Sequence, residues 1–173
     1  MNVLRSTHLT IARVTCFFLA IALLTGCPCL MSALYYIALD AEEAQGDGDV
    51  RLRSNAHEGK TVLLFPGESI YFTELNMRNG KFEVWVTYSN DNADDVLGEI
   101  VDVYLDDELF GSFAAKDTGS HGLGWDNFAE SPILGIFTPD GEKHVFSLTV
   151  REDTGDSYGI EIDYLGMREY CER

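Results

Sequence analysis

The chain has 173 residues and a formal net charge of −17 at pH 7, and its first 39 residues contain no Asp or Glu. The part from Asp40 onward therefore holds all 29 acidic residues against ten Lys and Arg, a formal charge of −19. Phosphate backbones and anionic lipid headgroups need a basic surface, so this composition argues against nucleic-acid binding and against adhesion to headgroups.

Residues 14–39 form the longest apolar stretch, with 26 residues and no charged side chain. About 20 such residues suffice for a helix that crosses a bilayer. Arg5 and Arg13 precede the stretch, and the positive-inside rule then predicts a signal anchor with its N-terminus in the cytoplasm. We therefore expect an N-terminal membrane segment at 1–39 and an extracytoplasmic domain at 40–173.

Two other interpretations of this segment stay open. Leu24-Thr25-Gly26-Cys27 has the form of a bacterial lipobox, which would place a lipid on Cys27 and leave 30–39 as linker and first strand. An ordinary cleaved signal peptide is the third, although the apolar core does not end in a clean small-x-small site. All three place the domain on the non-cytoplasmic side of a membrane.

The cysteines define no disulfide framework within the domain. Cys16, Cys27 and Cys29 lie in the apolar stretch, and Cys171 is near the C-terminus. Cys171 could pair with another chain or with Cys29, or stay a free thiol.

After a glycine-rich acidic loop at 45–49, the sequence consists of short alternating runs separated by turn signals at intervals of about ten residues. No segment shows a helical period over three turns. This spacing predicts an all-β domain, and the long, uneven loops favour a jelly-roll β-sandwich, preceded by one N-terminal apolar helix. The expected strands are 50–53, 61–65, 69–73, 81–88, 98–106, 108–113, 133–137, 143–151 and 158–167.

Alternation also predicts which side chains face the core. In 81–88 the inward set is Phe82, Val84, Val86 and Tyr88. In 158–167 we expect Ile160, Ile162 and Tyr164 to share one face.

Sequence signatures of catalysis are absent. There is no Gly-x-Ser-x-Gly elbow, His-Glu-x-x-His helix or phosphate-binding glycine loop. The histidines His57, His121 and His144 are widely spaced, and we expect His144 to face solvent from a strand. We predict that the chain is not an enzyme.

A second acidic loop does not have the spacing of a calcium-binding motif. Asp91, Asp94 and Asp95 crowd together, but the order of ligands that an EF-hand needs is missing. A solvated acidic loop is the favoured interpretation.

Trp125 lies in the glycine-rich stretch 116–127 and is the strongest candidate for ligand contact. Its flat ring could stack on the apolar face of a pyranose while Asp126 and Asn127 bind the hydroxyl groups. The same indole could instead plug the end of the core, and the residues alone leave both possibilities open.

Between residues 59 and 167 the chain contains, in order, NGKFEVWVTYSN, VDVYLDDELFGSF, TGSHGLGWDNF, GEKHVFSLTV and YGIEIDYLGM. In this order the segments resemble carbohydrate-binding modules of families 6 and 35. NGKFEVWVTYSN resembles their "aG.Y.v..rYan" strand, and VDVYLDDELFGSF resembles "v.v.vnG..vg". TGSHGLGWDNF resembles the "TG.W..W" loop, GEKHVFSLTV resembles "G.h.l.l", and YGIEIDYLGM resembles the closing "nIDYi.v" strand. The resemblance implies a galactose-binding-like jelly roll that binds glycans without catalysis.

The resemblance also implies site residues. The glycan-binding set would be Trp125, Asp126, Asn127, Phe128 and Glu161. Phe128 stands where the family has a second loop tryptophan, and Glu161 stands where it often has a sugar-binding asparagine. A structural Ca²⁺ is implied as well, held by Asp40, Glu42 and Asp163.

Together these observations predict a non-catalytic, membrane-attached, extracytoplasmic recognition domain whose partner is a glycan. The alternative is a structural or auxiliary subunit of a membrane or cell-surface assembly that binds protein partners. The replaced aromatic residue at Phe128 and the unassigned Cys171 favour that alternative.

Overall fold

The computed structural model describes residues 36–75, 77, 79–92, 98–119, 122 and 124–171. The predicted membrane segment up to residue 35, with the lipobox and its Cys27, lies outside the described residues. Within the described part of the chain, no helix has the length and apolar character needed to cross a membrane.

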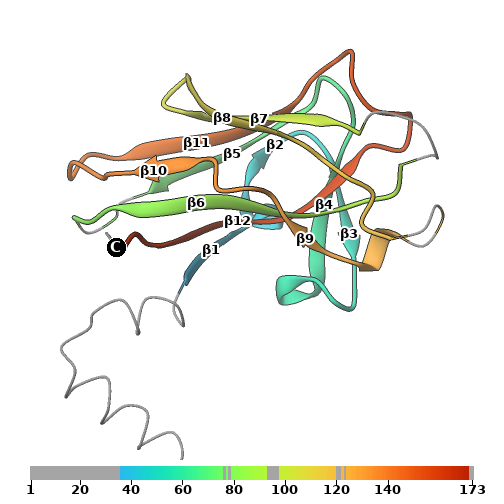
Figure 1. The fold of residues 1–173 in the computed structure, drawn as a ribbon, viewed down its shortest axis with the longest axis horizontal. Coiled ribbons are helices and arrows are strands. Elements are labelled where there is room, and N and C mark those ends of the chain that lie inside the picture. Colours follow the sequence, from blue (N-terminus) through green and yellow to red (C-terminus); the bar gives the residue numbers. More distant parts are fainter. Residues whose placement is uncertain are drawn as a thin grey trace, which may run out of the picture. The chain divides into compact units, whose positions relative to one another are not determined.

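Two antiparallel sheets make up the domain, and they confirm the predicted β-sandwich (Figure 1). The first sheet has the order β10 (Gly135–Phe137), β6 (Phe82–Asn90), β12 (Ile160–Glu169), β4 (Lys60–Leu64) and β3 (Asp49–Leu52), with β1 (Tyr36–Asp40) paired to β12 and β9 (Ala129–Glu130) paired to β6. The second has the order β2 (Gln45–Gly46), β5 (Ser69–Leu75), β11 (His144–Val150), β7 (Ile100–Leu105) and β8 (Glu108–Ala114). The described helical turns are the short 3₁₀ segments η1 (Ala41–Glu43), η2 (His57–Gly59) and η3 (Gly124–Asp126).

The start of the domain lies before the boundary predicted for a signal anchor. Residues 36–39, which that interpretation places at the end of an apolar helix and the lipobox interpretation in a linker and first strand, form strand β1 (Tyr36–Asp40) against β12. Ile37 and Leu39 alternate along this strand and pack against the core, so burial in the sandwich accounts for their apolar character. The predicted boundary at Leu39 therefore falls inside a strand. The expected loop at 45–49 also contributes a short strand, β2.

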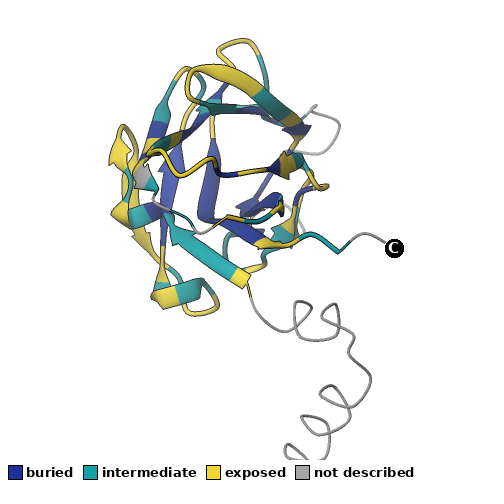
Figure 2. Ribbon diagram, turned by 90° about the vertical axis from the view of Figure 1, so that its left-hand side faces the viewer, coloured by how far each residue is buried: buried dark blue, intermediate teal, exposed yellow. Residues whose placement is uncertain are grey.

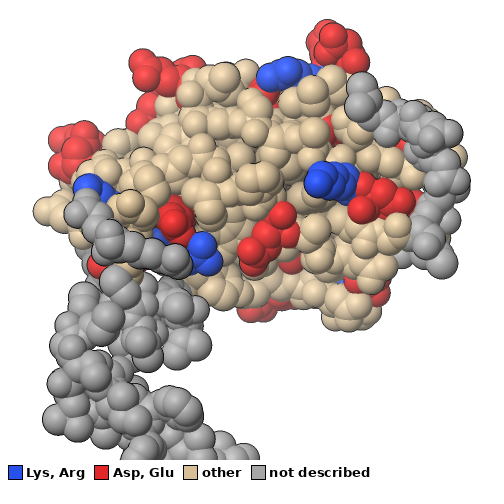
Figure 3. Space-filling model, in the orientation of Figure 1, with Lys and Arg blue, Asp and Glu red and all other residues tan. Residues whose placement is uncertain are grey.

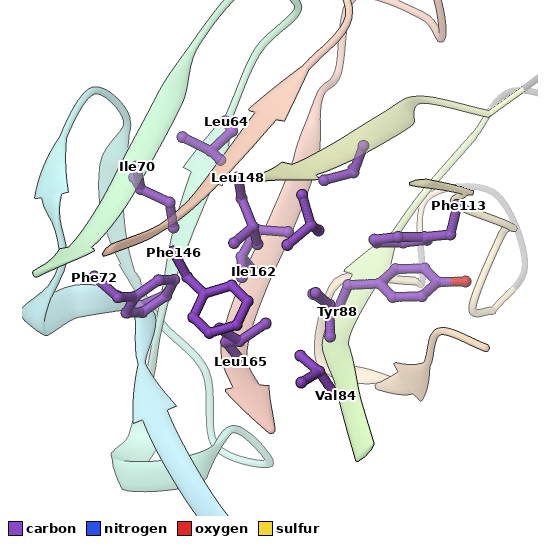
Figure 4. Packing of buried hydrophobic residues seen from close by; sticks show 14 of the residues in the cluster. Leu64, Ile70, Phe72, Val84, Tyr88, Phe113, Phe146, Leu148, Ile162 and Leu165 are labelled. Carbon is purple, nitrogen blue, oxygen red and sulfur yellow. The ribbon is translucent and has the colours of Figure 1, made fainter. Parts of the chain in front are cut away.

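The core lies between the two sheets, where buried residues of both gather (Figures 2 and 4). Phe82, Val84, Val86 and Tyr88 all belong to it, as alternation predicted. Phe146 of β11 is fully buried at its centre, next to aromatic rings from other strands.

A β-bulge interrupts β12 at Asp163. Ile162 pairs with Tyr88 while Tyr164 pairs with Thr87, so β12 carries one extra residue at this point. The prediction that Tyr164 shares a face with Ile162 is therefore wrong. The bulge turns Tyr164 toward His57, and Leu165 takes the next core position instead.

Several basic side chains of the domain are paired with acidic ones. On the face seen in Figure 3 the Lys and Arg side chains lie beside acidic ones and form no continuous basic patch. The ion pairs include Arg51–Asp49, Arg151–Asp102 and Arg168–Glu83. That face offers little of the positive potential that a phosphate backbone requires.

Candidate functional site

Trp125 lies in η3, on the connection between β8 and β9. Its backbone carbonyl accepts a hydrogen bond from Ser89 Oγ at 3.3 Å, and the Asn127 N–H closes the turn on Gly124 O at 2.9 Å. The indole is half-buried and is not part of the hydrophobic core cluster of the described residues. This position favours the loop-rim interpretation over a plug in the core.

Glu161 is buried in β12 and does not present a free carboxylate. Arg53 Nε donates to Glu161 Oε2 at 2.7 Å, Arg53 Nη2 donates to Oε1, and Thr61 Oγ1 donates to Oε2 at 2.8 Å. Glu161 is 1% exposed. The bidentate ion pair thus compensates a carboxylate that would otherwise be costly to bury.

Arg53 also connects this pair to the tryptophan. Its guanidinium carbon lies 5.9 Å from the centroid of the Trp125 ring, within the range of a cation–π contact. The Arg53 side chain therefore bridges the closing strand and the glycine-rich loop.

The two residues after Arg53 hold the acid next to the tryptophan. Ser54 Oγ donates to Asp126 Oδ2 at 2.6 Å, and the Asn55 N–H donates to Oδ1 at 3.1 Å. Asn55 Nδ2 donates to the Asp126 carbonyl at 2.9 Å. These bonds, led by that from Ser54, lower the pKa of Asp126, so its carboxylate is ionised at neutral pH.

Residues 53–55, which we name the Arg53–Asn55 segment, thus contact three of the five residues predicted to bind glycan. Trp125, Asp126 and Glu161 are brought together, while Asn127 is exposed and Phe128 is half-buried on the same loop. The sequence analysis missed this segment because about 70 to 110 positions separate it from its partners. The signal available in the sequence was the excess of acidic over basic residues. A glutamate that becomes buried in such a chain requires a cationic partner, so each Arg was a candidate for that role.

Two of the three residues predicted to bind calcium, Asp40 and Asp163, contact His57. The His57 N–H donates to both Asp163 oxygens, at 3.0 and 3.2 Å, and His57 Nδ1 lies 2.6 Å from Asp40 Oδ1. Burial raises the pKa of Asp163 to about 6, and the charges of Asp40 and Glu42 act in the same direction. The hydrogen bond to Asp40 raises the pKa of His57.

The carboxylate of Glu42 is only partly paired. Its Oε2 is buried and has no hydrogen-bond partner among the described residues, and Lys60 Nζ lies 3.9 Å from its Oε1. The charges of Asp40 and Glu42 both act on the Asp163 carboxyl. In the part of the chain that is described, no three or more His, Cys, Asp or Glu side chains are already set in a metal-binding arrangement.

The structure also describes two other residues for which the sequence predicted an exposed position. His144 was expected to face solvent, but it is half-buried, with Nδ1 2.6 Å from Asp106 Oδ2 and Nε2 3.1 Å from Asp140 Oδ1. Asp91 was expected in a solvated loop, but it is buried and accepts a hydrogen bond from the Gly122 N–H at 2.6 Å. Asp94, Asp95 and His121 lie outside the described residues.

No protein-family model matches the chain, and no curated protein matches it in sequence. Solved structures do match in fold. A family 35 carbohydrate-binding module from Clostridium thermocellum aligns with a TM-score of 0.61 and 16% identity over 77% of this chain and 97% of the module. The C-terminal family 6 module of a marine laminarinase from Zobellia galactanivorans aligns with a TM-score of 0.58 and 16% identity over 78% of this chain and all of the module.

A third similar structure is an enzyme. An exo-β-1,3-galactanase from Phanerochaete chrysosporium, solved with β-1,3-galactotriose, aligns with a TM-score of 0.58 and 14% identity. The match covers 76% of this chain but 29% of the galactanase. At these identities the likeness establishes the fold, which is that of carbohydrate-binding modules, and leaves the ligand to be argued from the site.

Proposed function

We propose that this domain is a non-catalytic carbohydrate-binding domain and that it binds a glycan at the loop end around Trp125. The observation that carries the proposal is the position of the indole, half-buried outside the core on a loop whose neighbours are hydrogen-bonding groups. The similarity in fold to carbohydrate-binding modules supports it. The net negative charge of the domain favours a neutral glycan, because a sulfated or uronic-acid polymer would be repelled.

Each side chain has a distinct role in this proposal. Trp125 supplies the apolar ring face, and Asn127 supplies an exposed amide that can both donate and accept hydrogen bonds. Glu161 acts indirectly, because both its oxygens are taken by Arg53 and Thr61. Its role is to position Arg53 against the ring.

Replacing Trp125 with alanine should weaken glycan binding by about five- to 150-fold, because stacking of one ring contributes on the order of 1–3 kcal/mol. Affinity gel electrophoresis against a panel of neutral polysaccharides measures this loss. Tyr71→Ala is the matched control, since Tyr71 is an exposed aromatic residue on β5 in the other sheet. Unchanged retardation of Trp125→Ala, or loss in the Tyr71 variant instead, would overturn the assignment of the site.

A structural calcium ion at Asp40, Glu42 and Asp163 is a second part of the proposal. The unpartnered Glu42 Oε2 and the raised pKa of Asp163 fit a cluster that lacks a cation. A calcium ion bound by these three carboxylates would link η1 and β1 to the closing strand β12. At one hundred times the dissociation constant, calcium would add about 2.7 kcal/mol, or roughly 5–10 °C in melting temperature.

Thermal unfolding with calcium and with EDTA tests this cluster. Asp163→Asn should reduce the calcium-dependent rise, while the exposed control Asp153→Asn should keep it in full. Equal rises in the two variants would rule out Asp163 as a ligand.

Membrane attachment through residues 14–39 or through a lipid on Cys27 stays a prediction and would place the domain on the extracytoplasmic face. Fractionation of cells that express the full chain or residues 36–173 tests it. Recovery of the full chain in the soluble fraction would refute attachment. The auxiliary-subunit alternative would be favoured if a protein partner co-purified with the full chain from the membrane fraction in stoichiometric amounts and no glycan bound.

A further inference from the structure

Three side chains are buried together where β6 ends and β7 begins. Asn90 ends β6, Asn92 follows it, and Glu99 directly precedes β7. Asn90 and Glu99 are fully buried and Asn92 is 5% exposed. The carbonyl of Ala115 completes the group from the strand end of β8, within 3.4 Å of both amide nitrogens.

The polar atoms of this group are poorly satisfied. Glu99 accepts a hydrogen bond from Asn90 Nδ2 at 2.8 Å and a long one from the Asp156 N–H at 3.3 Å, and no Lys or Arg among the described residues forms an ion pair with it. Asn90 Oδ1 and Asn92 Oδ1 are buried and have no hydrogen-bond partner among the described residues. Burial, and to a smaller extent the charge of Asp156, raises the pKa of Glu99.

Unpartnered buried oxygens of this kind are costly, at roughly 1–3 kcal/mol each. With both amides turned so that their oxygens face Glu99 and Ala115, a cation would bind these acceptors and compensate the carboxylate at once. Calcium prefers such a mixed set of carboxylate, amide and backbone carbonyl oxygens.

We propose that Glu99, Asn90, Asn92 and the carbonyl of Ala115 form a binding site for one calcium ion. This site is separate from the cluster at Asp40, Glu42 and Asp163 and uses a different kind of ligand set. Amide and carbonyl oxygens supply most of it, with Glu99 as its acidic member.

The spacing of the atoms supports one shared ion. Two oxygens bound at 2.3–2.6 Å to the same calcium lie about 2.8–3.5 Å apart when they are neighbours in its shell. Asn90 Nδ2 lies 2.8 Å from Glu99 Oε2 and 3.4 Å from Ala115 O, and Asn92 Nδ2 also lies 3.4 Å from Ala115 O. Rotating each amide by 180° about its terminal bond places oxygens at these positions without moving the neighbouring residues. Water would supply the remaining ligands.

The backbone encloses the site from two sides. A Cβ at Gly98 would lie 1.7 Å from Ala115 O and 2.7 Å from Asn92 Nδ2, so only glycine allows this approach. Gly155 has a φ of +78°, and a Cβ there would lie 2.5 Å from Glu99 Oε1. The loop before β12 therefore closes over the carboxylate.

Calcium at this site would stabilise the turn η3, which carries Trp125. The Asn90 backbone carbonyl accepts a hydrogen bond from the Thr118 N–H at 3.0 Å, and Thr118 Oγ1 lies 3.1 Å from Gly124 O. The ligand Asn90 is thus joined through Thr118 to the residue before the tryptophan. We expect the ion to stabilise this turn whether or not it binds a glycan.

Calorimetric titration of the full chain with calcium, in an Asp163→Asn background, tests the site without the other cluster. This protein should bind one calcium ion. Glu99→Gln should weaken binding at least about tenfold, and Asn92→Asp should tighten it about tenfold, because affinity follows the number of ligand charges. Asn79→Asp, which adds the same charge at an exposed asparagine between β5 and β6, should leave the affinity within about threefold.

The outcomes that would overturn the proposal are equally definite. The proposal is wrong if the Asp163→Asn protein binds no calcium. It is also wrong if adding Glu99→Gln to that protein leaves its calcium affinity unchanged. If Glu99→Gln fails to fold, the Asn92→Asp variant decides. Its added buried carboxylate should destabilise the domain without calcium, and a failure of calcium to restore that stability would overturn the proposal. None of these results depends on finding the glycan, so the site and the proposed function can fail separately.

Discussion

Replacing Arg53 with alanine should destabilise the domain by about 3 kcal/mol, because it leaves Glu161 charged, buried and unpaired. Most single substitutions cost about 1 kcal/mol, so this is a large effect for a residue that is partly exposed. It should also loosen the hold on Trp125 and Asp126, since Arg53 contacts the ring and precedes the two residues that bind the acid. Urea unfolding at pH 7 measures the loss.

The double variant Arg53→Met with Glu161→Met separates the two contributions. Removing both charges should recover much of the stability, because the desolvation cost disappears with the pair. Arg51→Ala is the control, since its ion pair with Asp49 is exposed and should contribute under about 1 kcal/mol. Equal losses for Arg51→Ala and Arg53→Ala would contradict the interpretation that the Arg53–Asn55 segment anchors this end of the domain.

Replacing Phe146 with alanine should cost about 3–5 kcal/mol, enough to unfold a domain of ordinary stability at physiological temperature. The ring is fully buried and meets Phe110 and Phe137 edge to face, with centroids 5.5 and 5.3 Å away. A cavity at this point would be lined by both sheets (Figure 4).

Its neighbour Val145 provides the control. Val145 is exposed on the same strand, so Val145→Ala should change stability by less than about 1 kcal/mol. Phe146→Leu should fall between the two. A loss for Phe146→Ala below about 1 kcal/mol would mean that the core is organised differently from this account.

The strands could be predicted from the sequence because alternation and turn residues are local signals. Phe82, Val84, Val86 and Tyr88 face the core as the period of two requires. The prediction of inward-facing residues fails in β12, where the extra residue Asp163 interrupts the period of two. Nothing near Asp163 marks the bulge, whose position depends on how β12 pairs with β6.

The beginning of the domain shows a different limit. Residues 36–39 are as apolar as the residues before them, so composition alone could not separate a strand from the end of a helix. Pairing with β12 and packing of Ile37 and Leu39 decide the matter, and neither is visible in the residues themselves.

The candidate site was predicted in part. A loop tryptophan that follows several glycines indicated where a ligand would stack, and Arg53 and the residues after it bring Trp125, Asp126 and Glu161 into one group. The sequence did not reveal that Glu161 requires Arg53, because that pairing joins residues 108 positions apart. The orphan oxygens of Asn90 and Asn92 were equally hidden, since an asparagine in a sequence gives no sign of burial.

The central claim is that a glycan binds at the loop end around Trp125. The most direct test is an NMR titration of the isotope-labelled protein with the polysaccharide that retards it most in affinity gels. We expect saturable shifts of the Trp125 indole N–H and of the backbone amides of residues 53–55 and 124–128. Shifts confined to other surfaces, such as the strands around Tyr71, or no shifts with any polysaccharide of the panel, would contradict the account.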